Sequence, residues 1–363
     1  MIIGAGRWRF AEEFPVRIIV ATTQVPFVRG GAEIHAQELC AALIAAGHCA
    51  DIVAIPFKWY PPQRVLDHML ACRLLDLSEA NGLSVGLVIG LKFPAYLVKH
   101  PNKVLWIVHQ YRSAYDMWNS PLDDLATYPD GMRVREAVRA ADAHIIPQAR
   151  HIFCNSMNVG NRLKEFLGID SKPLYHPPRG AARFYCEGAE DYLFFPSRIG
   201  TWKRQELLIQ ALKYTINPVR VRFCGTPDDP LYLKRLESLA RNLGVARRIE
   251  WLGEVSENQK YDLFAHCLAV VYPPLNEDLG YVTMEAMLSG KPVITCADSG
   301  GSLEFVKHRE TGLICEADAK SLAAAMDELW DNRAGAKAWG VAGRERYQSM
   351  GITWPNVIER LLG

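Results

Sequence analysis

The sequence has no excess of charge of either sign, no long apolar run and no basic tract. Its 41 lysine and arginine residues almost balance its 40 aspartate and glutamate residues, and no stripe of basic and interleaved aromatic residues occurs. Nucleic acid is therefore not expected as a partner, because binding to it requires concentrated positive charge. No run approaches the ~20 apolar residues that cross a membrane, so no transmembrane segment is expected.

The nine cysteines are scattered and include no C-x-x-C pair, which gives no support to a zinc site or a thioredoxin-like motif. Their odd number in a large chain suggests a reducing cytosol, and a cytoplasmic protein is expected. The N-terminus lacks the apolar core of a signal peptide. Its basic and aromatic segment from Arg7 to Phe10 is interpreted as a loose tail, with a peripheral contact at the inner face of the membrane as the alternative.

Apolar residues make up 49% and charged residues 22% of the 363 residues, which suits two globular domains. Val16 to Ala21 predicts a strand, Ala32 to Ala46 a helix and Asp51 to Ile55 another strand. Together they form a β-α-β unit, which implies a parallel sheet. A proline- and glycine-rich segment at 170–190 interrupts this alternation, which restarts at a strand from Leu193 to Pro196.

The chain is accordingly predicted to be an α/β protein with two Rossmann-like, doubly wound domains. Residues 16–180 would form the first and 188–340 the second, while 341–363 would supply a C-terminal helix that packs back on the first domain. Ligands of open parallel sheets bind beyond the carboxyl ends of the strands, so the residues that follow strands are expected to face one cleft. These residues are Gly30, Gly31, His109, Ser197–Lys203, Gly225–Thr226, Gly253–Val255 and Glu277–Tyr281.

The most informative stretch holds two carboxylates, Glu277 and Glu285, separated by seven residues. On one continuous helix they would lie ~12 Å apart along the axis, too far apart to reach one small group. An apolar run typical of a buried strand precedes them, and Gly290 marks a helix stop after them. We therefore expect Glu277 on the loop that leaves the strand and Glu285 in the following helix, where both can line one pocket. Two acids aimed at a ligand that is not a metal suggest the hydroxyl groups of a sugar and a ribose.

Arg198 and Lys203 follow a predicted strand, and Lys203 opens a helix expected to end at Leu212. The arginine fork can bind two phosphate oxygens, lysine supplies a compact charge, and a helix N-terminus adds amide donors. Together they suit a diphosphate, with a solvated basic loop as the alternative. No D-x-D motif occurs where a metal-bound diphosphate would need it, so no metal is expected.

Glycine and histidine residues supply further candidates. Gly30 and Gly31 lie just after the first strand, where the lack of side chains lets backbone amides approach a ligand. Glu33, in the first turn of the helix, is a candidate for acceptor binding or simply a favourable partner of the helix dipole. His109 ends a buried strand and is well placed to meet a substrate, with a satisfied rim histidine as the alternative.

Weaker signals come from two turns and from aromatic residues. Ser299 to Gly301 is interpreted either as an anion nest or as an N-cap with a tight turn, and Asp228 with Asp229 as a solvated turn. Aromatic residues between 58 and 130 are candidates for an acceptor surface, Tyr111 above all, with others expected in the core. They are Trp59, Tyr60, Phe93, Tyr96, Tyr111, Tyr115 and Trp118.

On these residues the chain resembles the family 4 retaining glycosyltransferases, which have the GT-B fold. The resemblance covers residues 16 to 337 and is carried by Gly30 to Glu33, His109, Arg198 with Lys203, and the seven-spaced acids. It implies two Rossmann-like domains that face each other across a deep cleft. The second would hold a nucleoside diphosphate sugar, and the first would shape the acceptor side.

The resemblance also implies a role for each matching residue. Arg198 and Lys203 would clamp the diphosphate, Glu277 would lie near the donor sugar and His109 near the reacting centre, and these four would form the catalytic set. Glu285 would accept hydrogen bonds from the ribose hydroxyls. Other residues would contact the β-phosphate, the sugar hydroxyls or the base. They are Gly30, Gly31, Gly225, Glu254, Val255, Asp278, Leu279, Gly280 and Tyr281.

Two positions depart from the family's pattern. Where the family often has E-G-F-G-L, this chain has an aspartate at position 278 in place of the glycine, which narrows the sugar pocket or makes it more acidic. The glycine that often follows the clamp lysine is Arg204. Both departures bear on the identity of the donor and leave the reaction class unchanged.

The resemblance implies metal-independent transfer of a sugar from a nucleotide to an acceptor hydroxyl, with retention at the anomeric carbon and without a cofactor. The partners would be a nucleotide-sugar donor and a saccharide or lipid-linked saccharide acceptor in cell-surface or extracellular polysaccharide assembly. Three alternatives stay open: a sugar-nucleotide epimerase on the same fold, a phosphorylase that uses pyridoxal phosphate, and a non-catalytic nucleotide-sugar-binding partner in an assembly complex.

Overall fold

The computed structural model describes residues 15–28 and 30–363, so the segment Arg7 to Phe10 lies outside the described residues. The chain divides into two compact units. The first comprises the described residues up to 105 together with 123–151, and the second comprises 106–122 with 152–363. The predicted domain limits of 16–180 and 188–340, which divide the chain in sequence order, stay a prediction.

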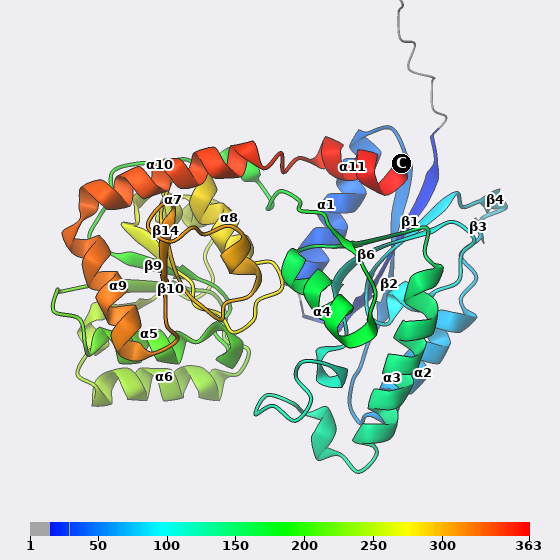
Figure 1. The fold of residues 1–363 in the computed structure, drawn as a ribbon, viewed down its shortest axis with the longest axis horizontal. Coiled ribbons are helices and arrows are strands. Elements are labelled where there is room, and N and C mark those ends of the chain that lie inside the picture. Colours follow the sequence, from blue (N-terminus) through cyan, green and yellow to red (C-terminus); the bar gives the residue numbers. More distant parts are fainter. Residues whose placement is uncertain (1–14, 29) are drawn as a thin grey trace, which may run out of the picture. The chain divides into compact units, whose positions relative to one another are not determined.

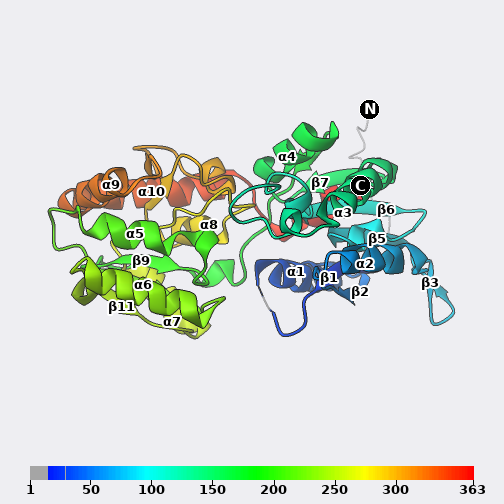
Figure 2. The same ribbon diagram turned by 90° about the horizontal axis from the view of Figure 1, so that it is seen from below.

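The first sheet has the strand order β2-β1-β5-β6-β7-β8. Strand β1 (Arg17–Gln24) pairs in parallel with the edge strand β2 (Cys49–Pro56), and α1 (Gly31–Ala45) lies against both strands (Figure 2). An apolar, β-branched run makes β1 suitable for burial on both faces. The other strands are β5 (Leu87–Lys92), β6 (Lys103–His109), β7 (His151–Cys154) and β8 (Lys172–Pro173). The other helices are α2 (Gln63–Leu74), α3 (Gly131–Ile145) and α4 (Met157–Leu167), with a small hairpin of β3 (Glu79–Ala80) and β4 (Leu83–Ser84).

The second sheet lies wholly in the second unit and has the doubly wound order β11-β10-β9-β12-β13-β14, with every pair parallel. Its strands are β9 (Leu193–Pro196), β10 (Val221–Cys224), β11 (Ile249–Trp251), β12 (Ala269–Val271), β13 (Val293–Cys296) and β14 (Gly312–Cys315). The strand order reverses between β9 and β12, so the loops that follow these two strands leave the sheet side by side. Such a switch point is where doubly wound sheets bind ligands.

Helices lie on both sides of the second sheet. In Figure 1, α5, α6 and α9 lie on one side of the labelled strands, and α7 and α8 lie on the other. Their bounds are Gln205–Leu212 (α5), Pro230–Asn242 (α6), Glu257–His266 (α7), Tyr281–Leu288 (α8) and Ala319–Asp331 (α9). The long helix α10 (Arg333–Ser349) packs against α8 and α9. The core of the second unit includes three fully buried rings, those of Phe194, Phe195 and Phe223. The Phe223 ring stacks on Trp251 with ring centroids 4.5 Å apart.

One helix start differs from the sequence-based expectation. The helix expected from Lys203 begins at Gln205, because Thr201–Lys203 forms a 3-10 turn and Arg204 adopts a left-handed backbone with φ of 58°. The last helix, α11 (Trp354–Leu362), includes Pro355 in its first turn, where the missing proline N–H costs no hydrogen bond. Trp354 packs on Trp106 of β6, and Arg360 lies over Phe153 of β7.

The described helices include none with both the length and the apolar character that crossing a membrane requires.

Candidate active site

The two acids lie where their spacing indicated. Glu277 is on the loop that follows β12, and Glu285 is in α8. Gly280 ends the loop with a left-handed backbone (φ of 85°), and a Cβ there would come within 2.7 Å of the Ser302 hydroxyl. The sharp turn at this glycine therefore separates the two acids and starts the helix.

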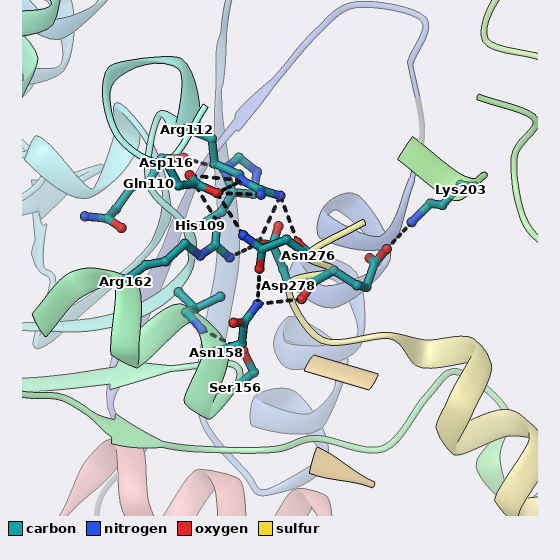
Figure 3. A network of polar contacts seen from close by, with 12 residues as sticks. His109, Gln110, Arg112, Asp116, Ser156, Asn158, Arg162, Lys203, Asn276 and Asp278 are labelled. Atoms are coloured by element: carbon teal, nitrogen blue, oxygen red, sulfur yellow. Dashed lines mark hydrogen bonds and ion pairs between the residues drawn. The ribbon is translucent and has the colours of Figure 1, made fainter. Parts of the chain in front are cut away.

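Lys203 and Glu277 form an ion pair at the switch point of the second sheet (Figure 3). The Lys203 ammonium also donates to the Tyr272 hydroxyl at 2.9 Å, and this hydroxyl donates to Glu277 Oε2 at 3.0 Å. Burial alone would lower the pKa of Lys203, but the charge of Glu277 and the contact with Tyr272 raise it above its usual value. The ammonium is therefore held charged and in place by Glu277 and Tyr272, and its role at a diphosphate stays a prediction.

Arg198, which was predicted to act with Lys203, has a different partner. Its Nη1 atom donates to Asp228 Oδ1 at 2.7 Å, and the side chain is half exposed. Asp228 and Asp229 are exposed in a bend, as expected; Asp228 also pairs with Arg198, and Asp229 caps α6 by accepting from Leu231 N at 2.9 Å. The role of Arg198 at a diphosphate stays a prediction.

Glu285 is almost fully buried and forms an ion pair with Lys260 of α7 at 3.2 Å. Lys260 also pairs with Glu257 at 3.3 Å. Burial raises the pKa of Glu285, and the charge of Lys260 opposes this rise. Lys260 was not expected from the sequence, because a lysine on a helix face has the same local pattern whether or not it meets a carboxylate. The ribose-binding role of Glu285 stays a prediction.

The loop from Asn276 to Gly280 is held by its side chains and by backbone hydrogen bonds to the segment after β13, where Asn276 N donates to Asp298 O at 2.9 Å. The Glu277 amide donates to Ser299 O at 3.3 Å, and Gly301 N donates to Glu277 O at 2.8 Å. The Ser299–Gly301 turn therefore braces the backbone of Glu277, a role outside both interpretations made from the sequence. In contrast, no acceptor is found among the described residues for the amides of Asp278, Leu279 and Gly280. Three successive amides at the start of α8 are suited to binding hydroxyl or phosphate oxygens.

The side chains of this loop do not all face a ligand. Leu279 is buried in an apolar cluster with Met284 and Phe305, so only its backbone is available. The Tyr281 hydroxyl is bonded to His176 Nε2, and the expected contact of the Tyr281 backbone with a sugar stays a prediction. Asp278 forms ion pairs with Arg162 and, at 3.7 Å, with Arg112.

His109 ends β6, as the sequence indicated, and its Nδ1 atom lies 2.8 Å from Gln110 O. Burial tends to raise the pKa of Asp278, yet the charges of Arg162, Arg112 and His109 together hold it below its usual value. His109 therefore interacts electrostatically with the aspartate of the loop. Its contact with a substrate stays a prediction.

The first unit contains the glycine candidates. Gly30 N donates to Glu33 Oε2 at 2.8 Å, and Glu33 Oε1 lies 3.2 Å from Lys92 Nζ. Both oxygens of Glu33 are thus engaged in local contacts, and its acceptor role stays a prediction. A Cβ at position 30 would lie 3.6 Å from its nearest neighbour, an ordinary contact distance. Packing within the unit therefore does not require a glycine at position 30.

The remaining donor-binding candidates have mixed outcomes. Gly225 has φ of 132°, and a Cβ there would lie 2.2 Å from Ser197 O, so packing of the chain already requires this glycine. Glu254 is exposed, and Val255 packs against the apolar core of the second unit. Of the aromatic acceptor candidates, Phe93, Tyr96 and Tyr115 are buried, while Tyr60 is exposed.

No group of three or more His, Cys, Asp or Glu side chains in the described ranges could hold a metal ion. Several polar residues that contact the loop or the two acids were missed by sequence reasoning. Some have partners distant in the chain, whereas Tyr272 lies only five residues before Glu277, where an aromatic at the end of a buried strand reads as core. The missed residues are Arg112, Asp116, Asn158, Arg162, Lys260 and Tyr272.

Comparisons with known proteins agree with this fold. Residues 187–346 match the family described as Glycosyl transferases group 1. The chain is 33% identical over 120 residues to alpha-1,3/1,6-mannosyltransferase ALG2 of Mus musculus, a match that covers 33% of this chain and only 29% of that protein. It is 30% identical over 391 residues to alpha-maltose-1-phosphate synthase of Mycolicibacterium smegmatis, covering 96% of this chain and 98% of that one.

Among solved structures, sucrose-phosphate synthase from Thermosynechococcus elongatus superposes with a TM-score of 0.77 at 18% identity, covering 95% of this chain and 97% of that one. This likeness establishes the GT-B fold. The sequence match along almost the whole of the synthase establishes the family. The chain belongs to the glycosyl transferases group 1 family.

Proposed function

We propose that this chain transfers a sugar from a nucleoside diphosphate sugar to an acceptor hydroxyl. The observation that carries the proposal is the Lys203 ammonium, held beside three successive backbone amides without protein acceptors at the switch point of a doubly wound sheet. Family membership supports it, as do relatives named as a mannosyltransferase and a maltose-1-phosphate synthase. The Lys203 ammonium suits a diphosphate, and the three backbone amides suit the hydroxyl groups of a sugar.

Lys203 would act on the leaving group. As the bond between the sugar and the phosphate stretches, negative charge grows on the diphosphate, and a fixed ammonium stabilises that charge more than it stabilises the ground state. A phosphate oxygen would compete with Glu277 for the ammonium. This competition would leave a carboxylate oxygen of Glu277 able to accept a hydrogen bond from a sugar hydroxyl. Arg198 would add a second cation once it leaves Asp228.

We further propose retention at the anomeric carbon. The resemblance to retaining glycosyltransferases supports this proposal. Glu277 accepts from Lys203 and Tyr272 through Oε2, and Asp278 meets Arg162 and Arg112 through Oδ1, so each carboxylate serves as an ion-pair partner and neither is assigned as a nucleophile. Attack on the same face as the departing phosphate, which then takes the acceptor proton, requires no such group. Because Lys203 and the start of α8 supply positive potential, the reaction is proposed to need no metal.

The acceptor is proposed to be a saccharide or lipid-linked saccharide used in cell-surface or extracellular polysaccharide assembly. Tyr111, in the segment that follows His109, and the exposed Tyr60 offer aromatic surface to such an acceptor.

Thermal unfolding with UDP, GDP, dTDP, ADP and CDP, each in EDTA, tests the proposal. A ligand at 100 times its dissociation constant adds about 2.7 kcal/mol to the free energy of unfolding, which gives a measurable shift. One nucleotide should stand out, and its sugar nucleotides are then tested for transfer, with the anomeric configuration of the product read by NMR. Absence of a shift with every nucleotide would contradict the proposal, and binding that appears only with Mg²⁺ would contradict metal independence.

A further inference from the structure

Four charged side chains from three elements, one buried and three partly buried, meet at the loop Asn276–Gly280 (Figure 3). Arg112 and Asp116 come from the segment after β6, Arg162 comes from α4, and Asp278 belongs to the loop itself. Arg162 is the most buried, with 6% of its side chain exposed, and it pairs with Asp278 and, at 3.7 Å, with Asp116. Arg112 Nη2 lies 2.6 Å from Asp116 Oδ2. The cluster holds two positive and two negative charges and is neutral as a whole.

The same cluster binds the backbone of the loop on one side. Arg112 Nη1 donates to Asn276 O at 3.1 Å, and Asn158 Nδ2 donates to Glu277 O at 2.8 Å. The Asn276 side chain donates to Asp116 Oδ2 at 3.0 Å and accepts from Asn158 at 2.8 Å. These contacts use the carbonyls at 276 and 277, whereas the next three amides have no acceptor among the described residues. The cluster therefore engages carbonyls of the loop and leaves these three amides without a protein acceptor among the described residues.

Backbone hydrogen bonds fix the start of the loop at Asn276 and Glu277, and the Leu279 side chain is buried, so the cluster is the polar anchor of the loop at Asp278. Asn276 has φ of 44° and Gly280 has φ of 85°, both in the left-handed region, and no regular ladder of hydrogen bonds follows Glu277. A buried arginine or aspartate that loses its partner is strongly unfavourable. Removal of one charge from the cluster should therefore shift the loop, since movement would bring solvent to the charge left behind.

We propose that Arg112, Arg162 and Asp278 are positioning residues that hold the amides of Asp278, Leu279 and Gly280 in place for the sugar of the donor. This inference rests on the proposed function and adds the residues that shape its sugar subsite. It is particular to this chain, because the cluster depends on the aspartate at position 278, where the family pattern often has glycine. Arg112 and Asp116 follow His109 closely in sequence, so the cluster also ties the segment that carries His109 to the donor loop.

The test separates the sugar subsite from the nucleotide subsite. Dissociation constants are measured by calorimetry for UDP-glucose, GDP-mannose, UDP and GDP with wild type and with Arg162→Met. For the sugar nucleotide that wild type binds, the variant should lose at least about tenfold in affinity, which corresponds to one or two hydrogen bonds. For the matching nucleoside diphosphate, affinity should change less than about threefold, because Lys203 does not contact the cluster's arginines.

The control is Lys164→Met, which removes an ion pair of the same helix α4, that of Lys164 with Asp170 at 2.7 Å, without touching the loop. It should bind both ligands as wild type does. Equal loss of affinity for sugar nucleotide and nucleoside diphosphate in Arg162→Met would indicate general damage and overturn the proposal. Unchanged affinity for the sugar nucleotide would overturn it as well. If wild type binds neither sugar nucleotide, the same comparison is made with sugar nucleotides of the base that thermal unfolding selects, and failure to bind any nucleotide would instead overturn the proposed function.

Two further variants keep the proposal testable if Arg162→Met does not fold. Asp278→Asn keeps the shape of the side chain and removes its charge, and it should show the same selective loss. Arg162→Lys keeps the charge without the planar fork and should recover part of the affinity for the sugar nucleotide. An Asp278→Asn protein that binds the sugar nucleotide as tightly as wild type would overturn the proposal.

Discussion

Arg204 and Asp298 form a two-point ion pair, with the two terminal arginine nitrogens 2.7 and 2.6 Å from the two carboxylate oxygens. Arg204 precedes α5 and has a left-handed backbone with φ of 58°, a conformation that glycine adopts without strain. The pair links the start of α5 to the loop after β13. It accounts for an arginine at the position where the family often has glycine, since the side-chain contact offsets the backbone strain.

This relationship predicts an order of stability for two variants. Arg204→Ala loses the ion pair and keeps the strained backbone, whereas Arg204→Gly loses the pair and relieves the strain. A left-handed residue other than glycine costs roughly 1–2 kcal/mol, so the glycine variant should be more stable than the alanine variant by about 1 kcal/mol. Urea unfolding of the two proteins measures the difference. An alanine variant as stable as the glycine variant would show that the backbone at 204 is not strained.

Much of the fold was predictable because it follows from local pattern. β9 has the predicted bounds Leu193–Pro196, and Glu277 and Glu285 lie on a loop and a helix as their spacing required. Apolar periodicity reports which face of an element is buried, and the alternation of strands and helices limits the topology to parallel sheets. These signals lie within windows of about ten to twenty residues, the range over which periodicity can be read.

The partners of the charged residues could not be predicted from such windows. Asp278 pairs with Arg162, 116 residues away, and Lys203 pairs with Glu277, 74 residues away. A charged residue in a loop has the same local sequence pattern whether water solvates it or an opposite charge from a distant part of the chain pairs with it. Gly225 shows the same limit, since a glycine that makes room for a ligand and one that makes room for Ser197 O look alike in sequence.

Lys203→Met should lower kcat by about 10²–10³-fold, which equals ~2.7–4 kcal/mol, if the ammonium stabilises the departing diphosphate. The variant also leaves Glu277 without its cation, so the double variant Lys203→Met/Glu277→Gln is measured beside it. If the loss came only from the orphaned carboxylate, the double variant would recover activity. Steady-state kinetics with the sugar nucleotide chosen by the binding panel measure kcat, and turnover close to wild type would remove Lys203 from the mechanism.

Lys103 predicts a pH-dependent stability in the first unit. Its ammonium is buried and donates to Tyr96 O at 3.2 Å and Val98 O at 3.0 Å. Burial, aided by the positive charge of Arg73, lowers the pKa of Lys103 to about 8. Between this value and the usual value of 10.5, the unfolded chain binds more protons than the folded chain. The folded chain is therefore favoured most when Lys103 is neutral. This contribution to the free energy of unfolding is complete above pH 10.5, decreases as the pH falls, and is lost as the pH falls through about 8.

The check compares wild type with Lys103→Met by urea unfolding at pH 7.5 and pH 9.5. The free energy of unfolding of wild type relative to the variant should rise with pH, by up to about 1.4 kcal/mol for each pH unit above 8. Lys99→Met, at an exposed lysine close in sequence, serves as the control. A difference between wild type and Lys103→Met that does not change with pH would contradict the prediction.

Gly225 and Gly253 lie in neighbouring loops, and Gly225 N donates to Gly253 O at 2.7 Å, yet alanine should affect them differently. Both have positive φ, 132° and 66°, so alanine at either position is strained by roughly 1–2 kcal/mol. At position 225 the new Cβ would also meet Ser197 O at 2.2 Å, whereas at position 253 nothing lies within 4 Å. Gly225→Ala should therefore destabilise by more than about 3 kcal/mol and Gly253→Ala by about 1 kcal/mol, as measured by urea unfolding. Equal losses of unfolding free energy in the two variants would mean that the loop after β9, which contains Ser197, moves away from the new Cβ. A requirement for glycine at position 225 would then have to come from a bound ligand.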